Sequence, residues 1–246
     1  MGEHQRIAVV TGAGGGIGAA CAIALAGQYD VTLCVDRDIA RAQATAHAIG
    51  PRGLVLQADA GDPEFGPLVA AEVARHGRTA VVVHALAYEE HASATELTRE
   101  SMMRSLTLGP VAAFSLFQAC ATDGAALIAI GSLHEHAAFR NCLGYNAAHG
   151  ALGQVVRSLA HEWAPRGIRV NAVVPGWIET PGERDLYGAE HLAKASAGLP
   201  FGKLGTPEQV AEAVAFVAGA SYMSGSFVTV DGALSVSLAR LPGEPR

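Results

Sequence analysis

Short apolar runs alternate with longer Ala-rich stretches along almost the whole chain. The apolar runs are rich in β-branched and aliphatic residues and have the length of buried strands. We expect strands at residues 7–10, 31–35, 54–57, 80–84, 126–130, 169–174 and 227–230. We expect helices at about residues 16–29, 41–49, from 63 onward, 100–121, 143–164 and 207–218. The alternation predicts an α/β fold, a doubly wound and mostly parallel sheet of about seven strands with helices on both faces.

The length and composition of the chain suit one such sheet. No linker or low-complexity run divides the 246 residues, so we expect residues 1–246 to form a single domain. Half of the residues are apolar (50%) and only 16% are charged. This balance fits a sheet buried on both faces, or an oligomer that hides further surface.

Charge and hydropathy argue against several kinds of partner. The net charge of −6 disfavours nucleic acid, whose binding depends on clustered Lys and Arg. No apolar run reaches the roughly 18 residues that span a bilayer, and the first residues lack a signal-peptide core. We therefore expect a cytoplasmic protein without a nucleic-acid or membrane partner. The cysteines lack metal-type spacing and His134-Glu135-His136 lacks an evident third ligand, so no metal site is expected.

A glycine-rich turn follows the first expected strand and opens the first expected helix. It consists of Thr11-Gly12-Ala13-Gly14-Gly15-Gly16-Ile17-Gly18. Glycines permit a tight turn and let backbone N–H groups approach a pyrophosphate, which the helix N-terminus also stabilises. Asp36 ends the second strand 20 residues after Gly16, where a carboxylate can bond the adenosine ribose. The pattern predicts a dinucleotide-binding site.

The charge of Asp36 also indicates which dinucleotide binds. A carboxylate repels the 2′-phosphate of NADP, and Gly15 offers no basic side chain to attract it. NAD(H) is therefore favoured over NADP(H), although the neighbouring Arg37 carries the opposite charge.

Further segments follow the glycine turn in a fixed order. They are Asp59-Ala60, Gly131-Ser132, Tyr145 at 13 residues after Ser132, RVNAVVPGWIET at 169–180, GTPE at 205–208 and VDG at 230–232. Together they cover residues 7 to about 233 and resemble the short-chain dehydrogenase/reductase family, with its TGxxxGxG and RVNxxxPGxxxT motifs. The resemblance implies a single Rossmann-type domain that binds a dinucleotide.

The resemblance also implies a set of cofactor contacts. Asp59 lies where the family contacts adenine, Pro175-Gly176 lies beside the nicotinamide ring, and Ile178 and Thr180 hold its carboxamide. The whole implied set is Gly12, Gly14, Gly16, Ile17, Gly18, Asp36, Asp59, Ala60, Ala85, Tyr145, His149, Pro175, Gly176, Ile178 and Thr180.

One catalytic position departs from the family pattern. In the family a serine orients the carbonyl, a tyrosine transfers the proton, and a lysine four residues later holds the ribose and lowers the tyrosine pKa. Ser132 and Tyr145 match the first two, but the motif reads YNAAH and places His149 at the lysine position. The resemblance implies Ser132, Tyr145 and His149 as the catalytic residues. Because an imidazole has a reference pKa of about 6.5, we expect either weak turnover on generic ketones or a pH–rate limb near 6 to 7.

Two further family residues are absent. The strand that ends NNAG in the family reads VHALA at 83–87, and no Asn precedes Asn141, so the central helix lacks its asparagine. Thr107 lies near that lost position. His84 is expected at the cofactor cleft or as a packed strand-end histidine, and Cys142 is expected to pack as a small apolar residue or to reach the pocket.

The expected reaction is the NAD(H)-dependent interconversion of a carbonyl and a secondary alcohol on a small-molecule substrate that the sequence does not specify. One alternative is a non-redox lyase, dehalogenase or cyclase reaction on the same Ser/Tyr pair. The halohydrin dehalogenases resemble the family and replace its lysine with arginine, but they lack the glycine turn. The other alternative is a catalytically silent NAD-binding subunit. The resemblance implies a homotetramer or a dimer, and residues 181–201 are expected to form a substrate lid.

Overall fold

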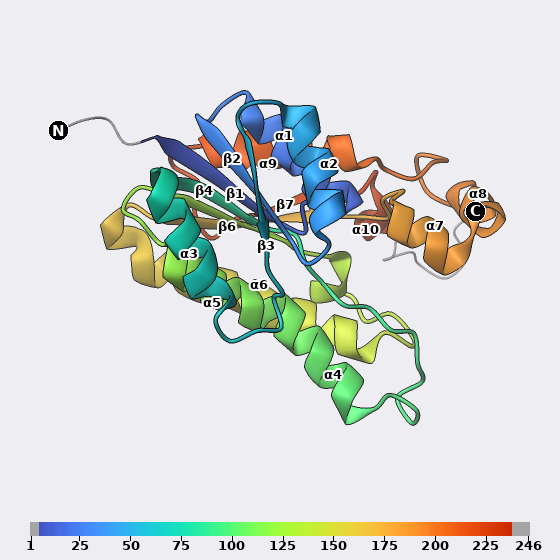
Figure 1. Cartoon of the computed structure of the whole chain (residues 1–246). Coiled ribbons are helices and arrows are strands. Elements are labelled where there is room, and N and C mark those ends of the chain that lie inside the picture. The colour runs from blue at the N-terminus through green and yellow to red at the C-terminus, as the bar shows by residue number, and fades with distance from the viewer. Residues whose placement is uncertain (1–4, 238–246) are drawn as a thin grey trace.

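A seven-stranded parallel sheet forms the centre of the computed structural model, which describes residues 5–237 (Figure 1). Residues 1–4, part of the segment judged for a signal peptide, and 238–246 lie outside the described residues. The strand order is β3-β2-β1-β4-β5-β6-β7. The strands are β1 (Arg6–Thr11), β2 (Val31–Asp36), β3 (Gly53–Gln57), β4 (Arg78–His84), β5 (Ala126–Ile130), β6 (Arg169–Pro175) and β7 (Phe227–Val230). All neighbours pair in parallel, so the predicted doubly wound α/β fold is confirmed.

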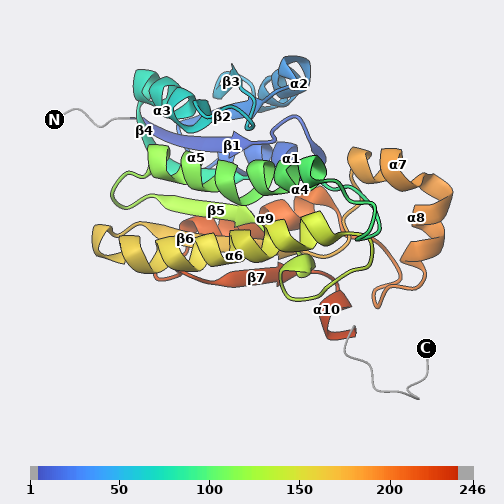
Figure 2. The same ribbon diagram turned by 90° about the horizontal axis from the view of Figure 1, so that it is seen from below.

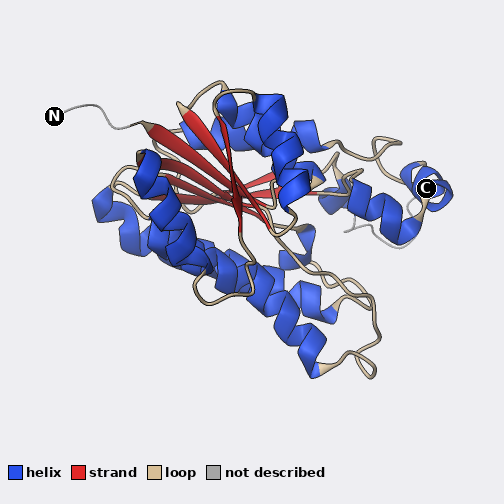
Figure 3. Cartoon of the chain, viewed as in Figure 1, coloured by secondary structure: helices blue, strands red, loops and turns tan. Residues whose placement is uncertain are grey.

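Helices cover both faces of the sheet (Figures 2 and 3). On one face lie α3 (Phe65–His76), α4 (Arg99–Leu106), α5 (Ala112–Cys120) and α6 (Leu143–Trp163), and on the other lie α1 (Gly16–Ala26), α2 (Ile39–Ile49) and α9 (Pro207–Gly219). Shorter helices are α7 (Pro181–Tyr187), α8 (Ala189–Ser196), α10 (Leu234–Ser237) and the single turns η2 (Leu133–Glu135) and η3 (Ala164–Arg166). No helix in the described part of the chain is both long and apolar enough to cross a membrane.

The two faces of each strand bury different side chains, as the two-residue period of a strand requires. In β1, Ile7 and Val9 contribute to the core beneath α3, α5 and α6. Ala8 and Val10 contribute to the core beneath α1 and α9. Because both faces are buried, the strands are nearly continuous apolar runs, and this explains why the sequence pattern located all seven.

The central helix differs from its sequence expectation. The helix expected at 100–121 is divided into α4, a π-helical turn η1 (Thr107–Val111) and α5. Pro110 lies inside that turn and has no N–H to donate. The buried ring of His84 binds the Leu108 carbonyl oxygen through Nε2 at 3.1 Å. In the wider π-helical turn, the Leu108 carbonyl therefore receives its hydrogen bond from the His84 side chain.

One other boundary was wrong, and one segment contains helices that were not expected. The first helix ends at Ala26 rather than Tyr29, because Gly27 caps it and Tyr29 packs under the Arg6 guanidinium, 4.8 Å from its ring centroid. Residues 181–201, expected as a lid, contain the helices α7 and α8, which lie beyond the sheet beside the carboxyl ends of the strands (Figure 2).

Candidate active site

Two cavities lie along the carboxyl edge of the sheet. One, of about 430 Å³, is bordered by the glycine turn, by the end of β2 and by the residues that follow β3 and β4. The other, of about 460 Å³, is bordered by the ends of β5 and β6 and by α6 and α7. We name them the adenosine cavity and the substrate cavity.

Gly12, Gly14 and Gly18 of the glycine turn leave no room for a Cβ, whereas a Cβ on Gly15 would make only ordinary contact. Gly12 has φ +69°, and a Cβ on it would lie 2.4 Å from the Ala85 carbonyl oxygen. A Cβ on Gly18 would lie 2.1 Å from the Gly12 carbonyl oxygen, so α1 packs directly against the turn. The helix begins after Gly15 with no side-chain cap and no acidic residue in its first turn. Its free N–H groups therefore form a site for an anion such as a pyrophosphate.

Asp36 is held in place at the adenosine cavity. Its carboxylate accepts hydrogen bonds from the Gly14 N–H and the Asp38 N–H, each at 2.9 Å. The expected residues Gly12, Gly14, Asp36, Asp59, Ala60 and Ala85 all border this cavity. Arg37 and Arg41 border it too, so the cavity carries both signs of charge.

The nicotinamide contacts implied by the sequence lie in the substrate cavity. Ile17, Pro175, Gly176, Ile178 and Thr180 all line it. A Cβ on Gly16 would lie only 3.0 Å from the Cβ of Thr180, the N-cap residue of α7. The glycine at this position therefore allows α7 to begin close to α1. Gly16 and Gly18 line neither cavity and act by permitting close packing.

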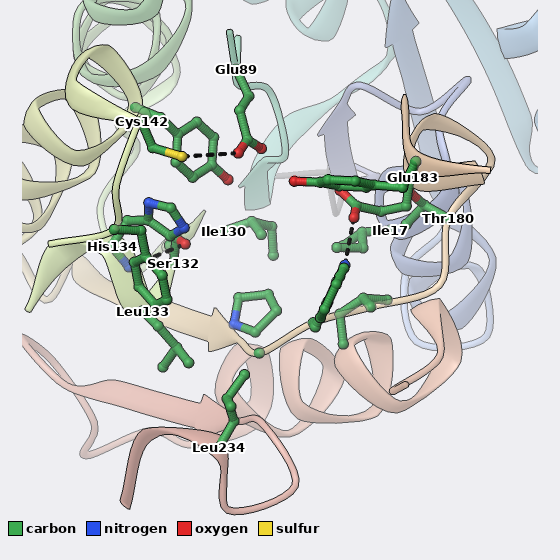
Figure 4. Close-up of a pocket in the computed structure, with 18 of the residues that line it drawn as sticks. Ile17, Glu89, Ile130, Ser132, Leu133, His134, Cys142, Thr180, Glu183 and Leu234 are labelled. Atoms are coloured by element: carbon green, nitrogen blue, oxygen red, sulfur yellow. Dashed lines mark hydrogen bonds between the residues drawn. The ribbon is translucent and has the colours of Figure 1, made fainter. Parts of the chain in front are cut away.

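Ser132 and Tyr145 border the same substrate cavity, and Figure 4 shows Ser132 beside His134 on its wall. Ser132 follows β5, begins η2, and accepts a hydrogen bond from the His134 N–H at 3.3 Å. Tyr145 lies in the first turn of α6. Burial raises the pKa of Tyr145 far above its usual value, and the Glu89 carboxylate raises it further, whereas a hydrogen bond with Ser132 lowers it. The phenol is therefore protonated at neutral pH.

His149 lies one helical turn after Tyr145, with ring centroids 4.3 Å apart. It is 4% exposed, and burial, followed by the nearby His134 and His84, lowers the pKa of His149 to about 3. The imidazole is neutral at physiological pH, so the pH–rate limb expected near 6 to 7 from this residue is not supported. Its Nδ1 has no hydrogen-bond partner and is one of two such buried side-chain atoms in the described residues.

His84 is a structural residue rather than a cleft residue. It is fully buried, and its Nδ1 lies 3.4 Å from the Thr11 hydroxyl. The Leu108 carbonyl can only accept, so Nε2 carries the ring proton and Nδ1 accepts from Thr11. Burial lowers the pKa of His84 to about 4, which keeps the ring neutral.

Within the trio that follows Ser132, His134 lines the substrate cavity, whereas Glu135 and His136 lie 3.7 Å apart as an ion pair outside it. His134 Nδ1 donates to the Asn146 side-chain oxygen at 2.6 Å and its ring stacks on Phe139. Glu135 is buried and accepts from the Arg157 guanidinium at 2.7 Å, while the His136 side chain is 62% exposed. The three side chains do not converge on one point.

Several residues of the substrate cavity carry no motif and were missed from the sequence. Glu89 and His91 follow β4, whereas Glu183 and Tyr187 lie on α7, and all four line the cavity. The Glu183 carboxylate accepts from the Trp177 indole N–H at 2.6 Å. Cys142 is 5% exposed and also lines the cavity, so it packs as a small buried residue and borders the pocket as well.

The chain is similar to several known proteins. Residues 12–235 match the family model described as enoyl-(acyl carrier protein) reductase. An uncharacterized short-chain type dehydrogenase/reductase of Sinorhizobium fredii is 34% identical over 94% of this chain, which spans 44% of that relative. The cis-4-hydroxycyclohexanecarboxylate dehydrogenase of Sinomonas cyclohexanicum is 36% identical, over 94% of this chain and 98% of the relative.

A solved structure agrees with these relatives. It is a proposed NAD(P)-dependent gluconate 5-dehydrogenase from Beutenbergia cavernae with NADP bound at low occupancy. Its sequence is 32% identical, the TM-score is 0.87, and the match covers 94% of this chain and 97% of that one.

Proposed function

Because this chain belongs to the short-chain dehydrogenase/reductase family, we propose that it is an NAD(H)-dependent oxidoreductase that interconverts a carbonyl and a secondary alcohol on a small molecule. The observation that carries the proposal is the shared lining of the substrate cavity. Ser132 and Tyr145 border the same space as Pro175-Gly176 and Thr180, the residues expected around a nicotinamide ring.

The residues fit the cofactor by three observations. Gly12, Gly14 and Gly18 have no space for a Cβ, the N-terminus of α1 is uncapped, and the buried His149 Nδ1 lacks a partner that a ribose hydroxyl can supply. Gly12 and Gly14 would hold the pyrophosphate and Asp36 the adenosine ribose, while Asp59-Ala60 would contact adenine. A bound nicotinamide supplies or accepts the hydride.

The protein's own residues handle the substrate oxygen. The Ser132 hydroxyl donates a hydrogen bond to the carbonyl oxygen, and the protonated Tyr145 phenol donates its proton to the same oxygen as the alcohol forms. Tyr145 retains its proton at neutral pH because its pKa is strongly raised. We therefore propose that carbonyl reduction is the easier direction.

We propose that His149 binds the ribose as the family's lysine does, but that it does not supply the positive charge of that lysine. The neutral ring can exchange a hydrogen bond with a ribose hydroxyl through Nδ1. It supplies no permanent cation to Tyr145, so cofactor binding survives better than proton transfer.

A panel of small ketones and secondary alcohols tests the proposal. It includes cis-4-hydroxycyclohexanecarboxylate and gluconate, from the names of two similar proteins, with their uncharged analogues. We expect neutral compounds to react faster, because the Glu89 and Glu183 carboxylates line the cavity. The second candidate function, a silent NAD-binding subunit, is favoured by the neutral His149 at the position where the family carries a lysine. Tight NADH binding without turnover on the whole panel would support it.

The choice of cofactor is a separate prediction. NADH is expected to bind at least tenfold more tightly than NADPH, a difference of about 1.4 kcal/mol, because Asp36 repels a 2′-phosphate. Fluorescence titration with both nucleotides measures the ratio. Asp36→Ala should lower the ratio of NADH to NADPH affinity. Asp62 is an exposed carboxylate outside both cavities, so Asp62→Ala should leave the ratio unchanged. Equal affinities in the native protein, for which Arg37 and Arg41 would be responsible, contradict the prediction.

We further propose a cytoplasmic homotetramer, with a dimer as the second choice. The central helical segment exposes the apolar side chains of Met103, Val111 and Phe114, which a subunit interface would cover. Multi-angle light scattering should give four chains per particle, and Phe114→Glu should lower that number. A stable monomer at micromolar concentration would exclude both assemblies.

A further inference from the structure

Glu89, His91 and Cys142 bring three metal-binding atoms together on the wall of the substrate cavity. One carboxylate oxygen, one imidazole nitrogen and the sulfur all lie within 4.8 Å of one another. Glu89 Oε1 is 2.7 Å from His91 Nε2, and Cys142 Sγ is 3.9 Å from the same oxygen. Figure 4 shows the Cys142 sulfur directed at the Glu89 carboxylate.

These spacings are close to those of a zinc site. Tetrahedral zinc with bonds of about 2.0 Å to N and O and about 2.3 Å to S separates its ligand atoms by about 3.3 to 3.5 Å. The observed separations lie on both sides of this range. Small rotations of the Glu89 and His91 side chains, both partly exposed, would bring the three atoms around one ion.

The backbone holds the two contributing segments together. Ala92 pairs with Cys142 in an isolated parallel bridge, and the Ala92 N–H donates to the Asn141 carbonyl at 2.9 Å. Asn141 has φ 61°, a left-handed conformation that Asn adopts more readily than most residues. The bridge fixes His91 beside the residue that begins α6, so the ligands from distant parts of the sequence are already close before an ion binds.

We propose that Glu89, His91 and Cys142 form a binding site for a divalent cation of the zinc type in the substrate cavity. Mixed S, N and O ligands suit Zn²⁺ better than Mg²⁺ or Ca²⁺, which prefer oxygen alone. Three protein ligands leave one tetrahedral position open. In this site that position is available to water or to an oxygen or nitrogen atom of the substrate, since the site borders the cavity that also contains Ser132 and Tyr145. The Tyr187 hydroxyl lies 3.2 Å from the same His91 Nε2, so this contact would give way as Nε2 binds an ion.

Metal binding is measured on the full chain after treatment with a chelator and buffer exchange. Titration with Zn²⁺ against a chromophoric chelator should give one ion per chain with a Kd below about 1 μM. Co²⁺ should produce a thiolate-to-cobalt absorption band. Cys142→Ala should remove the band and weaken Zn²⁺ binding at least tenfold, and His91→Ala should weaken it similarly. Cys120→Ala and His47→Ala serve as matched controls, since Cys120 is buried in α5 and His47 is exposed on α2, both outside the cavity.

The outcomes are distinct from those of the proposed oxidoreductase activity. The Zn²⁺ titration requires neither NADH nor a substrate, so it can succeed even if the protein fails to bind NADH or to turn over any compound. Circular dichroism shows whether each variant folds. If Cys142→Ala does not fold, the Zn²⁺ affinity of His91→Ala tests the site, because His91 lies in an exposed loop where the substitution leaves the fold intact. The site is excluded if the native chain binds Zn²⁺ no more tightly than His91→Ala, or if the cobalt band persists in Cys142→Ala.

Discussion

Tyr145→Phe is expected to lower turnover at least about 100-fold while NADH affinity changes less than about twofold. The substitution removes only the hydroxyl that donates the proton, and positioned proton transfer contributes about 10²- to 10⁴-fold to rates. The ring keeps its packing in α6 and its contact with His149. Turnover is followed with the panel compound that the native protein converts fastest, and NADH affinity by fluorescence titration. Tyr222→Phe, at a fully exposed position, should match the native protein in both.

The same variant separates the reaction classes. If the native protein consumes its substrate with no change in the nicotinamide absorption band, the reaction is a non-redox one on the Ser132–Tyr145 pair. If Tyr145→Phe retains full activity, the proton comes from another group, and the assignment of Tyr145 is wrong.

His149→Lys is expected to raise the oxidation of generic secondary alcohols about tenfold or more near pH 8. A cation one helical turn from Tyr145 stabilises the phenolate that accepts a proton from an alcohol. Each unit by which the pKa of Tyr145 falls corresponds to about 1.4 kcal/mol and a tenfold larger phenolate fraction. Rates are measured from pH 5 to 10 for the native protein, His149→Lys and His149→Ala. His136→Lys, which adds the same charge at an exposed site, controls for net charge.

The native profile tests the state of His149 directly. With its pKa lowered to about 3, the ring is neutral throughout pH 5 to 10 and should add no limb there. If the native pH–rate profile has a limb near 6 to 7 and this limb disappears in His149→Ala, then bound cofactor or substrate raises the pKa of His149 so that the ring can be protonated. If neither substitution changes rate or NADH affinity, His149 lies outside the active site.

The fold and the close packing of the glycine turn could be predicted because they depend on local rules. Buried parallel strands are apolar on both faces, and the turn at Gly12 and Gly18 requires glycine for reasons visible in sequence spacing. The protonation states could not be predicted, because the desolvation of Tyr145 and His149 depends on neighbours far along the chain.

The sequence also did not predict that Glu89 and His91 line the substrate cavity. Glu89 and His91 lie in a loop with no motif, and they meet Cys142 only through the bridge at Ala92. The helices α7 and α8 were missed because each is a short segment with few buried residues, Leu192 being the one buried residue of α8. Their formation depends on the Thr180 cap and on contacts with the rest of the molecule.

The buried ring of His84 affects how variants of this protein should be interpreted. By binding Thr11 on β1 and Leu108 on the central helix, it joins the floor of the adenosine cavity to the helix that packs against α6. A substitution there leaves the Leu108 carbonyl without its side-chain donor in the interior, whereas the Thr11 hydroxyl keeps its contacts with the Val83 carbonyl and the Ala85 N–H. In a mutational scan, loss of function at position 84 is therefore expected to reflect a smaller amount of folded protein rather than a slower reaction per molecule.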